Sequence, residues 1–161
     1  MFTRPIIDSL DFALKGMEIS GEVPMAELPR MAELLTDFEG RISFVVRGLE
    51  GKDGKPLLKL TLDGVCNLRC QRCLKPLIYP VKLEANLRLL AEGELNESDM
   101  EDDEADSIAA EQRLDVLTLL EEELLLSLPI APKHEAGDCQ IASEGLTRPT
   151  SPFAALAALK K

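Results

Sequence analysis

Apolar and polar residues alternate along residues 57–65 and 78–90, and this alternation predicts two β-strands. In the first segment three leucines share one face, and charged or polar side chains take the other face; the three are Leu58, Leu60 and Leu62. In the second segment an apolar side chain recurs at every second residue from Tyr79 to Leu89. Strands of this kind bury one face and leave the other to solvent, as in an antiparallel sheet.

Two further signals extend this sheet towards the N-terminus. Arg41–Arg47 is rich in β-branched and aromatic residues, which predicts a strand. The Asp53-Gly54 pair that follows it is a strong hairpin turn signal. We also expect a first strand around Phe12–Leu14. The sheet built from residues 10–90 is then antiparallel, and it is either open or closed into a barrel.

Helical spacing occurs at one place within residues 10–90 and again after the sheet. Pro24–Leu35 has apolar residues at helical intervals, but an internal proline limits it to short helical pieces. After the sheet, Asp115 is a good N-cap and Pro129 ends a helix. The apolar stripe of that helix predicts a packed face, and Glu121–Glu123 are expected mainly on its outer side. The stripe consists of Leu117, Leu120, Leu124 and Leu128.

The remaining segments complete an α+β architecture. Residues 92–110 are acidic and poor in apolar side chains, which predicts a mobile loop. Residues 130–151 have the composition of a loop, and Pro152 opens a short C-terminal helix over residues 152–161. A chain of 161 residues suits one domain. We therefore predict a single domain, 1–161, with an antiparallel sheet, a packed C-terminal helix, a mobile acidic loop and a short terminal helix.

Charge is distributed unevenly along this acidic chain. The formal charge is -11, but nine acidic and no basic residues lie within 92–106, whereas residues 41–91 carry a net charge of +6. The total charge argues against nucleic acid, which needs clustered Lys and Arg, and the basic middle segment weakens that argument. No apolar stretch is long enough for a membrane span, and Asp8 and Asp11 interrupt any signal peptide. We expect a cytoplasmic protein with reduced thiols and neither membrane nor DNA as a partner.

Four residues have the types and spacing of a structural zinc site. Cys70-x2-Cys73 is the two-ligand knuckle of many such sites, and His134-x4-Cys139 is a second pair with suitable spacing. Together they would close a tetrahedral Cys3His set around one zinc ion. Alternatively, the cysteines are small buried hydrophobic residues. Cys66 is expected in the core.

Cys66, Cys70 and Cys73 also resemble the cluster-binding loop of radical S-adenosylmethionine enzymes, where three thiolates hold an iron–sulfur cluster. That barrel needs about 200 residues, and only 88 follow Cys73 in this chain. Arg72 also stands where those enzymes usually carry an aromatic residue. No catalytic residue is predicted, because the single histidine, His134, lies in a loop without an oxyanion or phosphate-binding motif.

Basic side chains lie on or near adjacent predicted strands, where they could form one positive surface for RNA phosphate. Alternatively, they are ordinary strand charges that protect against aggregation. The candidates for contact with RNA or another partner are Arg69, Arg72, Lys75, Lys82 and Arg88.

Three motifs occur in a fixed order: CQRCLKP at 70–76, LDVLTLLEEELLLSLPIAPKH at 114–134, and SPFAALAALKK at 151–161. With the acidic stretch between the first two, they resemble the bacterial large ribosomal RNA subunit accumulation proteins (the YceD-like family). The resemblance implies a non-enzymatic role in the accumulation of 23S rRNA, through synthesis, processing or early assembly of the large subunit. The four candidate zinc ligands match this family's CxRC pair and its loop pair; Cys66 lies where relatives need not have cysteine.

The charge pattern leaves two partner classes open. The basic segment could bind a 23S rRNA precursor, and the acidic loop and helix could bind a basic ribosomal protein of the large subunit. The short C-terminal helix docks on the core or is offered to a partner's groove. A function of a different class is a metal- or thiol-dependent enzyme acting on RNA or nucleotides.

Overall fold

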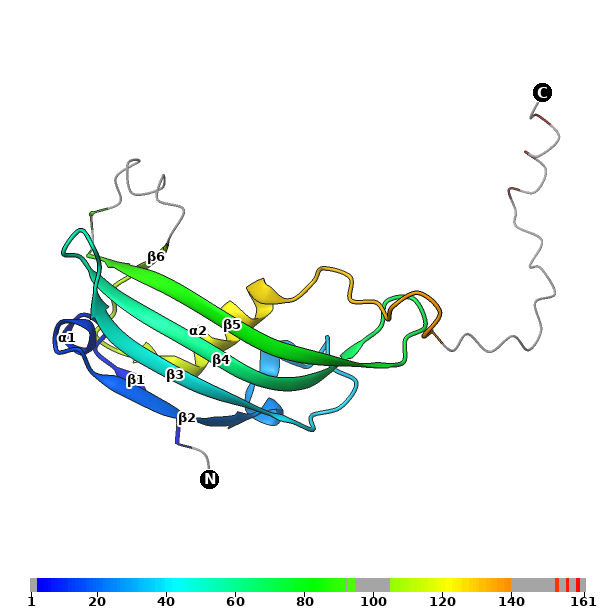
Figure 1. Cartoon of the computed structure of the whole chain (residues 1–161), viewed down its shortest axis with the longest axis horizontal. Helices are drawn as coiled ribbons and strands as arrows, with labels where there is room; N and C mark the ends of the chain where they lie inside the picture. The colour runs from blue at the N-terminus through cyan, green and yellow to red at the C-terminus, as the bar shows by residue number, and fades with distance from the viewer. Residues whose placement is uncertain are drawn as a thin grey trace.

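A five-stranded sheet forms the main layer of the protein (Figure 1). The computed structural model describes residues 3–91, 93–94, 105–139 and the single residues 153, 156 and 159. The strands of the sheet are β2 Glu18–Pro24, β3 Arg41–Glu50, β4 Pro56–Arg69, β5 Pro76–Leu90 and β6 Asp106–Ala109. Their spatial order is β2-β3-β4-β5-β6, and every pair except β5–β6 is antiparallel. The predicted α+β class and antiparallel sheet are confirmed, and the sheet is open rather than closed into a barrel.

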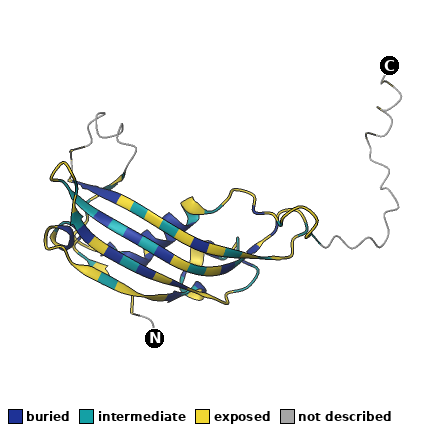
Figure 2. Ribbon diagram, viewed as in Figure 1, coloured by how far each residue is buried: buried dark blue, intermediate teal, exposed yellow. Residues whose placement is uncertain are grey.

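Strands β3, β4 and β5 form two long hairpins, which confirm and extend the three strands predicted within residues 41–90. The first hairpin turns at the predicted Asp53-Gly54 pair, where Gly54 has a φ of 74°, a conformation that favours glycine. The alternating leucines of β4 are fully buried on one face: Leu58, Leu60 and Leu62. Figure 2 shows the resulting stripes of buried and exposed residues across the sheet.

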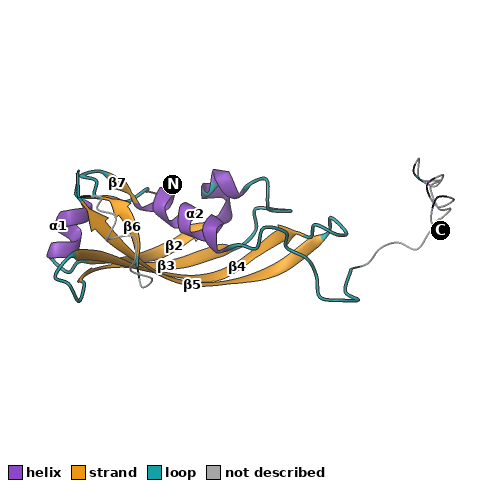
Figure 3. Cartoon of the chain, turned by 90° about the horizontal axis from the view of Figure 1, so that it is seen from above, coloured by secondary structure: helices purple, strands orange, loops and turns teal. Residues whose placement is uncertain are grey.

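Helix α2 (Val116–Ser127) covers the apolar face of this sheet (Figure 3). As predicted, the Asp115 side chain caps it by accepting hydrogen bonds from the Leu117 and Thr118 amides at 2.9 and 3.3 Å. Leu117, Leu120 and Leu124 of its predicted stripe are buried, and Leu128, just past its end, is partly buried against the same core. Two 3-10 turns, Met25–Glu27 and Pro29–Met31, pack in the same layer and match the short helical pieces expected there. None of the helices that the structure describes is long and apolar enough to span a membrane.

The N-terminal prediction is wrong. The segment around Phe12–Leu14 belongs to helix α1 (Ser9–Leu14), because the Asp8 side chain caps the Asp11 amide at 3.1 Å. Phe12 is buried while Leu14 is 76% exposed, as expected for opposite sides of a helix. The edge strand of the sheet is β2 instead, and the short strands β1 (Ile6–Ile7) and β7 (Leu114–Asp115) pair separately.

Part of the predicted acidic loop is a strand. Within 92–110, β6 pairs in parallel with Leu87–Leu90 of β5, and Ile108 packs against the core. Residues 92 and 95–104 lie outside the described residues, so the expected mobility of this loop stays a prediction. Of the predicted helix at 152–161 the structure describes only three residues, whose side chains are exposed: Phe153, Leu156 and Leu159.

The glutamates of α2 do not lie mainly on its outer side, which corrects the prediction. Glu121 is 4% exposed, and its Oε1 accepts hydrogen bonds from the amides of Arg30 and Met31 at 2.6 and 3.3 Å. The carboxylate therefore caps the start of the second 3-10 turn, where backbone N–H groups have no partner within the turn. Glu122 is half-exposed and pairs with the Arg30 guanidinium at 3.2 Å.

Glu123 is buried in a less favourable environment. It is 9% exposed. Burial raises its pKa above the ordinary value, and the negative charges of Asp106 and Glu122 raise it further. The folded state therefore favours the protonated form of this side chain.

Glu123→Gln is expected to stabilise the protein at pH 7 and to have little effect at pH 4. The pKa of Glu123 is raised in the folded state. The stability that Glu123 contributes is therefore fully present at a pH below about 4.3, the ordinary pKa of a glutamate in the unfolded chain. This contribution is lost as the pH rises through the pKa of Glu123 in the folded protein. Urea denaturation of both proteins across this range measures the difference. A wild type more stable than Glu123→Gln at pH 7 would contradict the assignment, and Glu122→Gln is the matched control.

Candidate metal centre and basic end of the sheet

The four predicted zinc ligands meet at the end of the sheet opposite α1 (Figure 1). Cys70 and Cys73 lie in the turn between β4 and β5, and His134 and Cys139 lie in the loop that follows α2. Their ligand atoms all lie within 4.8 Å of one another. Among the described residues, this is the only group of His, Cys, Asp and Glu side chains close enough to share a metal ion.

The spacing of the donor atoms fits a tetrahedral zinc ion. The Sγ atoms of Cys70 and Cys139 are 3.7 Å apart, and His134 Nδ1 lies 3.4 Å from Cys73 Sγ and 3.7 Å from Cys139 Sγ. With ordinary Zn–S and Zn–N bonds, the edges of a tetrahedron measure about 3.8 Å between two sulfurs and about 3.6 Å between sulfur and nitrogen. A disulfide would bring two sulfurs to about 2.05 Å. The residues present therefore fit zinc and do not form a disulfide.

The turn between β4 and β5 orients both of its cysteines. The Leu74 amide donates to the Cys70 carbonyl at 2.9 Å, and the Cys70 amide donates to the Lys75 carbonyl at 3.0 Å. Leu74 has a φ of 61°, in the left-handed region, which closes the turn tightly. The Arg72 amide points at Cys70 Sγ from 3.4 Å. An N–H directed at sulfur stabilises the thiolate that zinc requires.

Contacts between the turn and the loop place the histidine. Its Nε2 lies 2.9 Å from the carbonyl oxygen of Pro76, so a proton on Nε2 is donated there and the Nδ1 lone pair faces the thiols. The Gln71 amide also donates to the Pro132 carbonyl at 2.8 Å. These backbone acceptors were not identified in the sequence, because a carbonyl carries no residue-type signal.

The thiols have unequal proton affinities. Burial alone would raise the pKa of Cys70, but hydrogen bonds from the backbone of Cys73, His134 and Arg72 lower it to about 5. Burial raises the pKa of Cys139, and the neighbouring Cys70 and Cys73 side chains raise it further. A second thiolate beside the first is therefore unfavourable unless a cation lies between them, and a divalent metal supplies that charge.

Cys66 is separate from this cluster. It is 1% exposed in the hydrophobic core, and burial raises the pKa of its thiol to about 11. This confirms its predicted place in the core. The three-cysteine iron–sulfur interpretation is wrong, because Cys66 does not converge with Cys70 and Cys73 and the fold is not a βα barrel.

The basic side chains on the outer face of the sheet are neutralised across the strands. Arg47 pairs with Glu18. Arg41 pairs with Glu22 at 3.7 Å and Lys59 with Glu84 at 3.4 Å. The face is thus mixed in charge, and it does not form the single positive surface that the sequence suggested.

Two of the five contact candidates lie within this sheet. Lys82 is exposed and directly opposite Asp63 in the register of β4 and β5. The Arg88 side chain is only 9% exposed and lies 3.8 Å from the Asp53 carboxylate. Arg88 is therefore removed from the surface on which we expected it.

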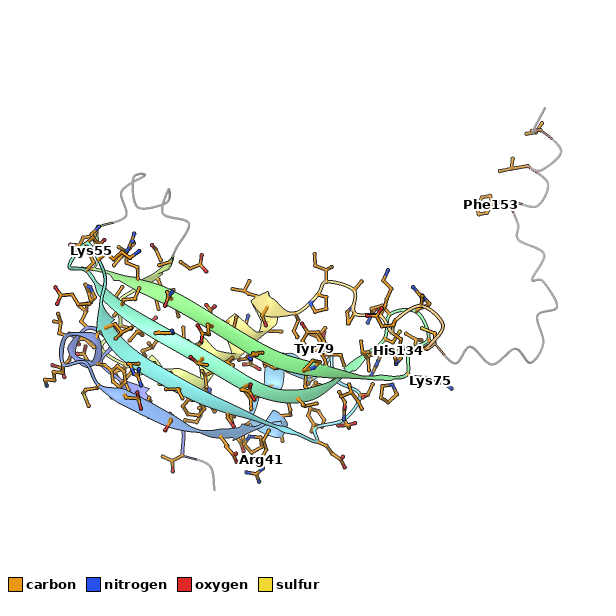
Figure 4. All side chains as sticks on the ribbon, viewed as in Figure 1. Arg41, Lys55, Lys75, Tyr79, His134 and Phe153 are labelled. Atoms are coloured by element: carbon orange, nitrogen blue, oxygen red, sulfur yellow. The ribbon has the colours of Figure 1, made fainter. Side chains whose placement is uncertain are left out.

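The other three candidates gather beside the cysteines. Arg69, Arg72 and Lys75 are exposed in or next to the β4–β5 turn, and no described acidic side chain forms an ion pair with them. Exposed Lys133, next to a predicted ligand, adds a fourth cation that the sequence interpretation missed. Figure 4 shows Lys75 and His134 at this end of the molecule. We call Arg69, Arg72 and Lys75 the basic end of the sheet.

Comparison with known proteins places the chain in a family. The family model described as "Large ribosomal RNA subunit accumulation protein YceD" matches residues 58–160, which include all four candidate zinc ligands. The chain belongs to the YceD family. A relative from Haemophilus influenzae that carries the same description is 26% identical over 170 residues, covering 96% of this chain and 94% of that protein. No solved structure matches significantly. The YceD family name implies a role in the accumulation of large-subunit ribosomal RNA, and it confirms the resemblance seen in the sequence motifs.

Proposed function

We propose that this YceD-family chain is a non-enzymatic cytoplasmic assembly factor that contacts a 23S rRNA precursor through the basic end of its sheet. The family supports the role in rRNA accumulation. The observation that carries the contact is the grouping of Arg69, Arg72 and Lys75, without acidic partners among the described residues, in or next to the turn that contributes two cysteines to the Cys3His cluster.

A zinc ion at this cluster would serve structure rather than chemistry. Cys70 and Cys73 would hold it from the turn, and His134 and Cys139 from the loop. Four protein donors complete a tetrahedron and leave no position for water or substrate, whereas catalytic zinc sites keep one position open. When bound, the ion supplies a cross-link between two segments about 60 residues apart in the chain. This argues against the metal-dependent enzyme considered above.

Close grouping of exposed cations at one end of the sheet suits recognition of RNA phosphate. Exposed Lys and Arg side chains release counterions from the nucleic acid when they bind, and this dominates affinity. Leu74 and Ile78 are 66% and 73% exposed at the same end, where they offer apolar contact to unstacked bases or sugars. The outer face of the sheet offers fewer cations for phosphate contact, because Arg41, Arg47 and Lys59 already have acidic partners.

The triple variant Arg69→Gln, Arg72→Gln, Lys75→Gln is expected to bind a 23S precursor transcript at least about 10-fold more weakly near 0.1 M salt. Each lost phosphate contact should reduce the slope of log affinity against log salt by roughly 0.7–0.9, so the three together reduce it by about 2–3. Fluorescence anisotropy with the labelled transcript over a series of salt concentrations measures both quantities.

A charge-matched control separates local contact from overall charge. The variant Arg41→Gln, Arg47→Gln, Lys59→Gln removes the same number of cations from the outer face, where each is already paired. It should change the affinity less than about 3-fold and leave the salt slope nearly unchanged. Equal losses in both triple variants, or no RNA binding by the wild type, would overturn the proposed contact.

A further inference from the structure

A groove of about 310 Å³ lies between β5 and α2, lined in part by Leu83–Asn86, Asp106 and Glu123. Its remaining lining residues are Ala105, which precedes β6, and Leu126 and Ser127 at the end of α2. None of the basic-end residues or zinc ligands lines it. The groove is therefore separate from the metal centre.

Two of the three carboxylates that line this groove lack a cationic partner among the described residues. Glu123 is 9% exposed, and no described residue gives it a hydrogen bond or ion pair. Exposed Asp106 has none either, and its negative charge acts on Glu123. Only the third carboxylate, Glu84, is paired, with Lys59 at 3.4 Å. No buried carboxylate oxygen of the described residues lacks a hydrogen-bond partner, so the oxygens of Glu123 reach the groove. A largely buried carboxylate without a cation is unfavourable, and the arrangement therefore favours a cation supplied from outside.

The groove suits an elongated organic cation better than a metal ion. Its carboxylates do not converge closely enough to share one ion, unlike the Cys3His cluster. Leu83, Ala85 and Leu126 provide apolar walls for the methylene stem of a Lys or Arg side chain. An Arg guanidinium can donate to two carboxylates at once, here those of Glu123 and Asp106.

The backbone beside the groove is also open to a partner. Strand β6 covers only Leu87–Leu90 of β5, and no described strand lies beside Leu83–Asn86 on the side away from β4. An extended segment can therefore lie along this edge while one side chain enters the groove. The chain's own residues 92–104 carry acidic but no basic side chains, so their charge disfavours them as the occupant.

We propose that this groove binds an arginine or lysine side chain from a basic, extended segment of another protein. The site is independent of the RNA contact proposed above. A basic partner would pair the Glu123 and Asp106 carboxylates and cover the exposed Leu126 side chain. Complementary charge of this kind fixes register and partner choice.

The test uses the full-length protein and an acetylated, amidated ten-residue peptide of alternating arginine and alanine. Backbone amide shifts in nuclear magnetic resonance should change at Leu83–Asn86 and around Glu123. The variant Glu123→Gln/Asp106→Asn should bind the peptide at least about 10-fold more weakly by fluorescence anisotropy. Thermal melting checks that the variant is folded, and its affinity for the 23S transcript should stay within about 2-fold of wild type, which separates this proposal from the RNA contact.

The matched control, Glu122→Gln/Asp11→Asn, removes the same net charge from exposed positions. It should weaken peptide binding less than about 2-fold. Equal weakening in both double variants, or shift changes confined to residues outside the groove, would overturn the proposal. So would groove shifts caused by Lys160→Ala/Lys161→Ala without peptide, because the chain's own end would then be the occupant.

Discussion

Protein carrying Cys73→Ser is expected to lose its zinc, with an affinity lowered by more than about 100-fold. Disturbing groups that merely orient a ligand typically costs 10- to 100-fold, and loss of a ligand itself should exceed this. The β4–β5 turn and the loop after α2 then lose their cross-link, so cleavage by protease within residues 130–139 should become faster. Metal content by mass spectrometry and limited proteolysis measure the two effects.

Cys66→Ala is the control, because this thiol lies in the core and outside the cluster. It should keep one zinc per chain while lowering stability through the small cavity it leaves. A wild-type protein without zinc, or a Cys73→Ser protein that keeps it, would contradict the metal centre. A purified protein that is brown and contains iron would contradict the assignment of zinc to this centre.

Glu121→Ala is expected to lower the free energy of unfolding by about 2–4 kcal/mol, a large effect for one side chain of α2. The substitution leaves the amides of Arg30 and Met31 without their charged acceptor, and the Met31 side chain is fully buried beside them. The corresponding fall in Tm is roughly 4–16 °C for a chain of this size. Urea denaturation at neutral pH gives the free energy directly.

Glu122→Ala tests the same helix one residue later. Its carboxylate forms only a half-exposed ion pair with Arg30, so the loss should stay below about 1 kcal/mol. If the two variants were equally stable, Glu121 would not hold the 3-10 turn. Glu121→Gln keeps an acceptor oxygen, so its free energy of unfolding should lie between those of Glu121→Ala and Glu122→Ala.

The sheet and α2 were predictable because their signals are local. Alternating leucines in β4 and the N-cap at Asp115 need no knowledge of the rest of the chain. The role of Glu121 was not predictable, because its partners lie about 90 residues away and are backbone groups. Three consecutive glutamates look like a solvated face until the packing partner of the helix is known. The strand assigned to Phe12–Leu14 failed for a related reason, since a short apolar run fits either a strand or one side of a helix.

The candidate site was predictable in its ligands and not in its charge. The knuckle spacing of Cys70 and Cys73 and the pair at His134 and Cys139 carry their chemistry in the sequence. Which cations stay unpaired depends on how the strands and turns meet: strand pairing brings Glu84 near Lys59, and the β3–β4 turn brings Asp53 near Arg88. Arg69, Arg72 and Lys75 at the turn end form no ion pair with a described acidic side chain, so the broad basic segment predicted from the sequence is reduced to the small basic end of the sheet.

The most direct test of the RNA contact is ultraviolet cross-linking in growing cells, followed by mass spectrometry of the RNA-linked peptides and sequencing of the attached RNA. The proposed function predicts adducts within residues 69–76 carrying 23S precursor sequence, and loss of those adducts in the Arg69→Gln, Arg72→Gln, Lys75→Gln variant. Recovery of ribosomal protein without any RNA adduct, or adducts confined to the outer face of the sheet around Arg41 and Lys59, would contradict it.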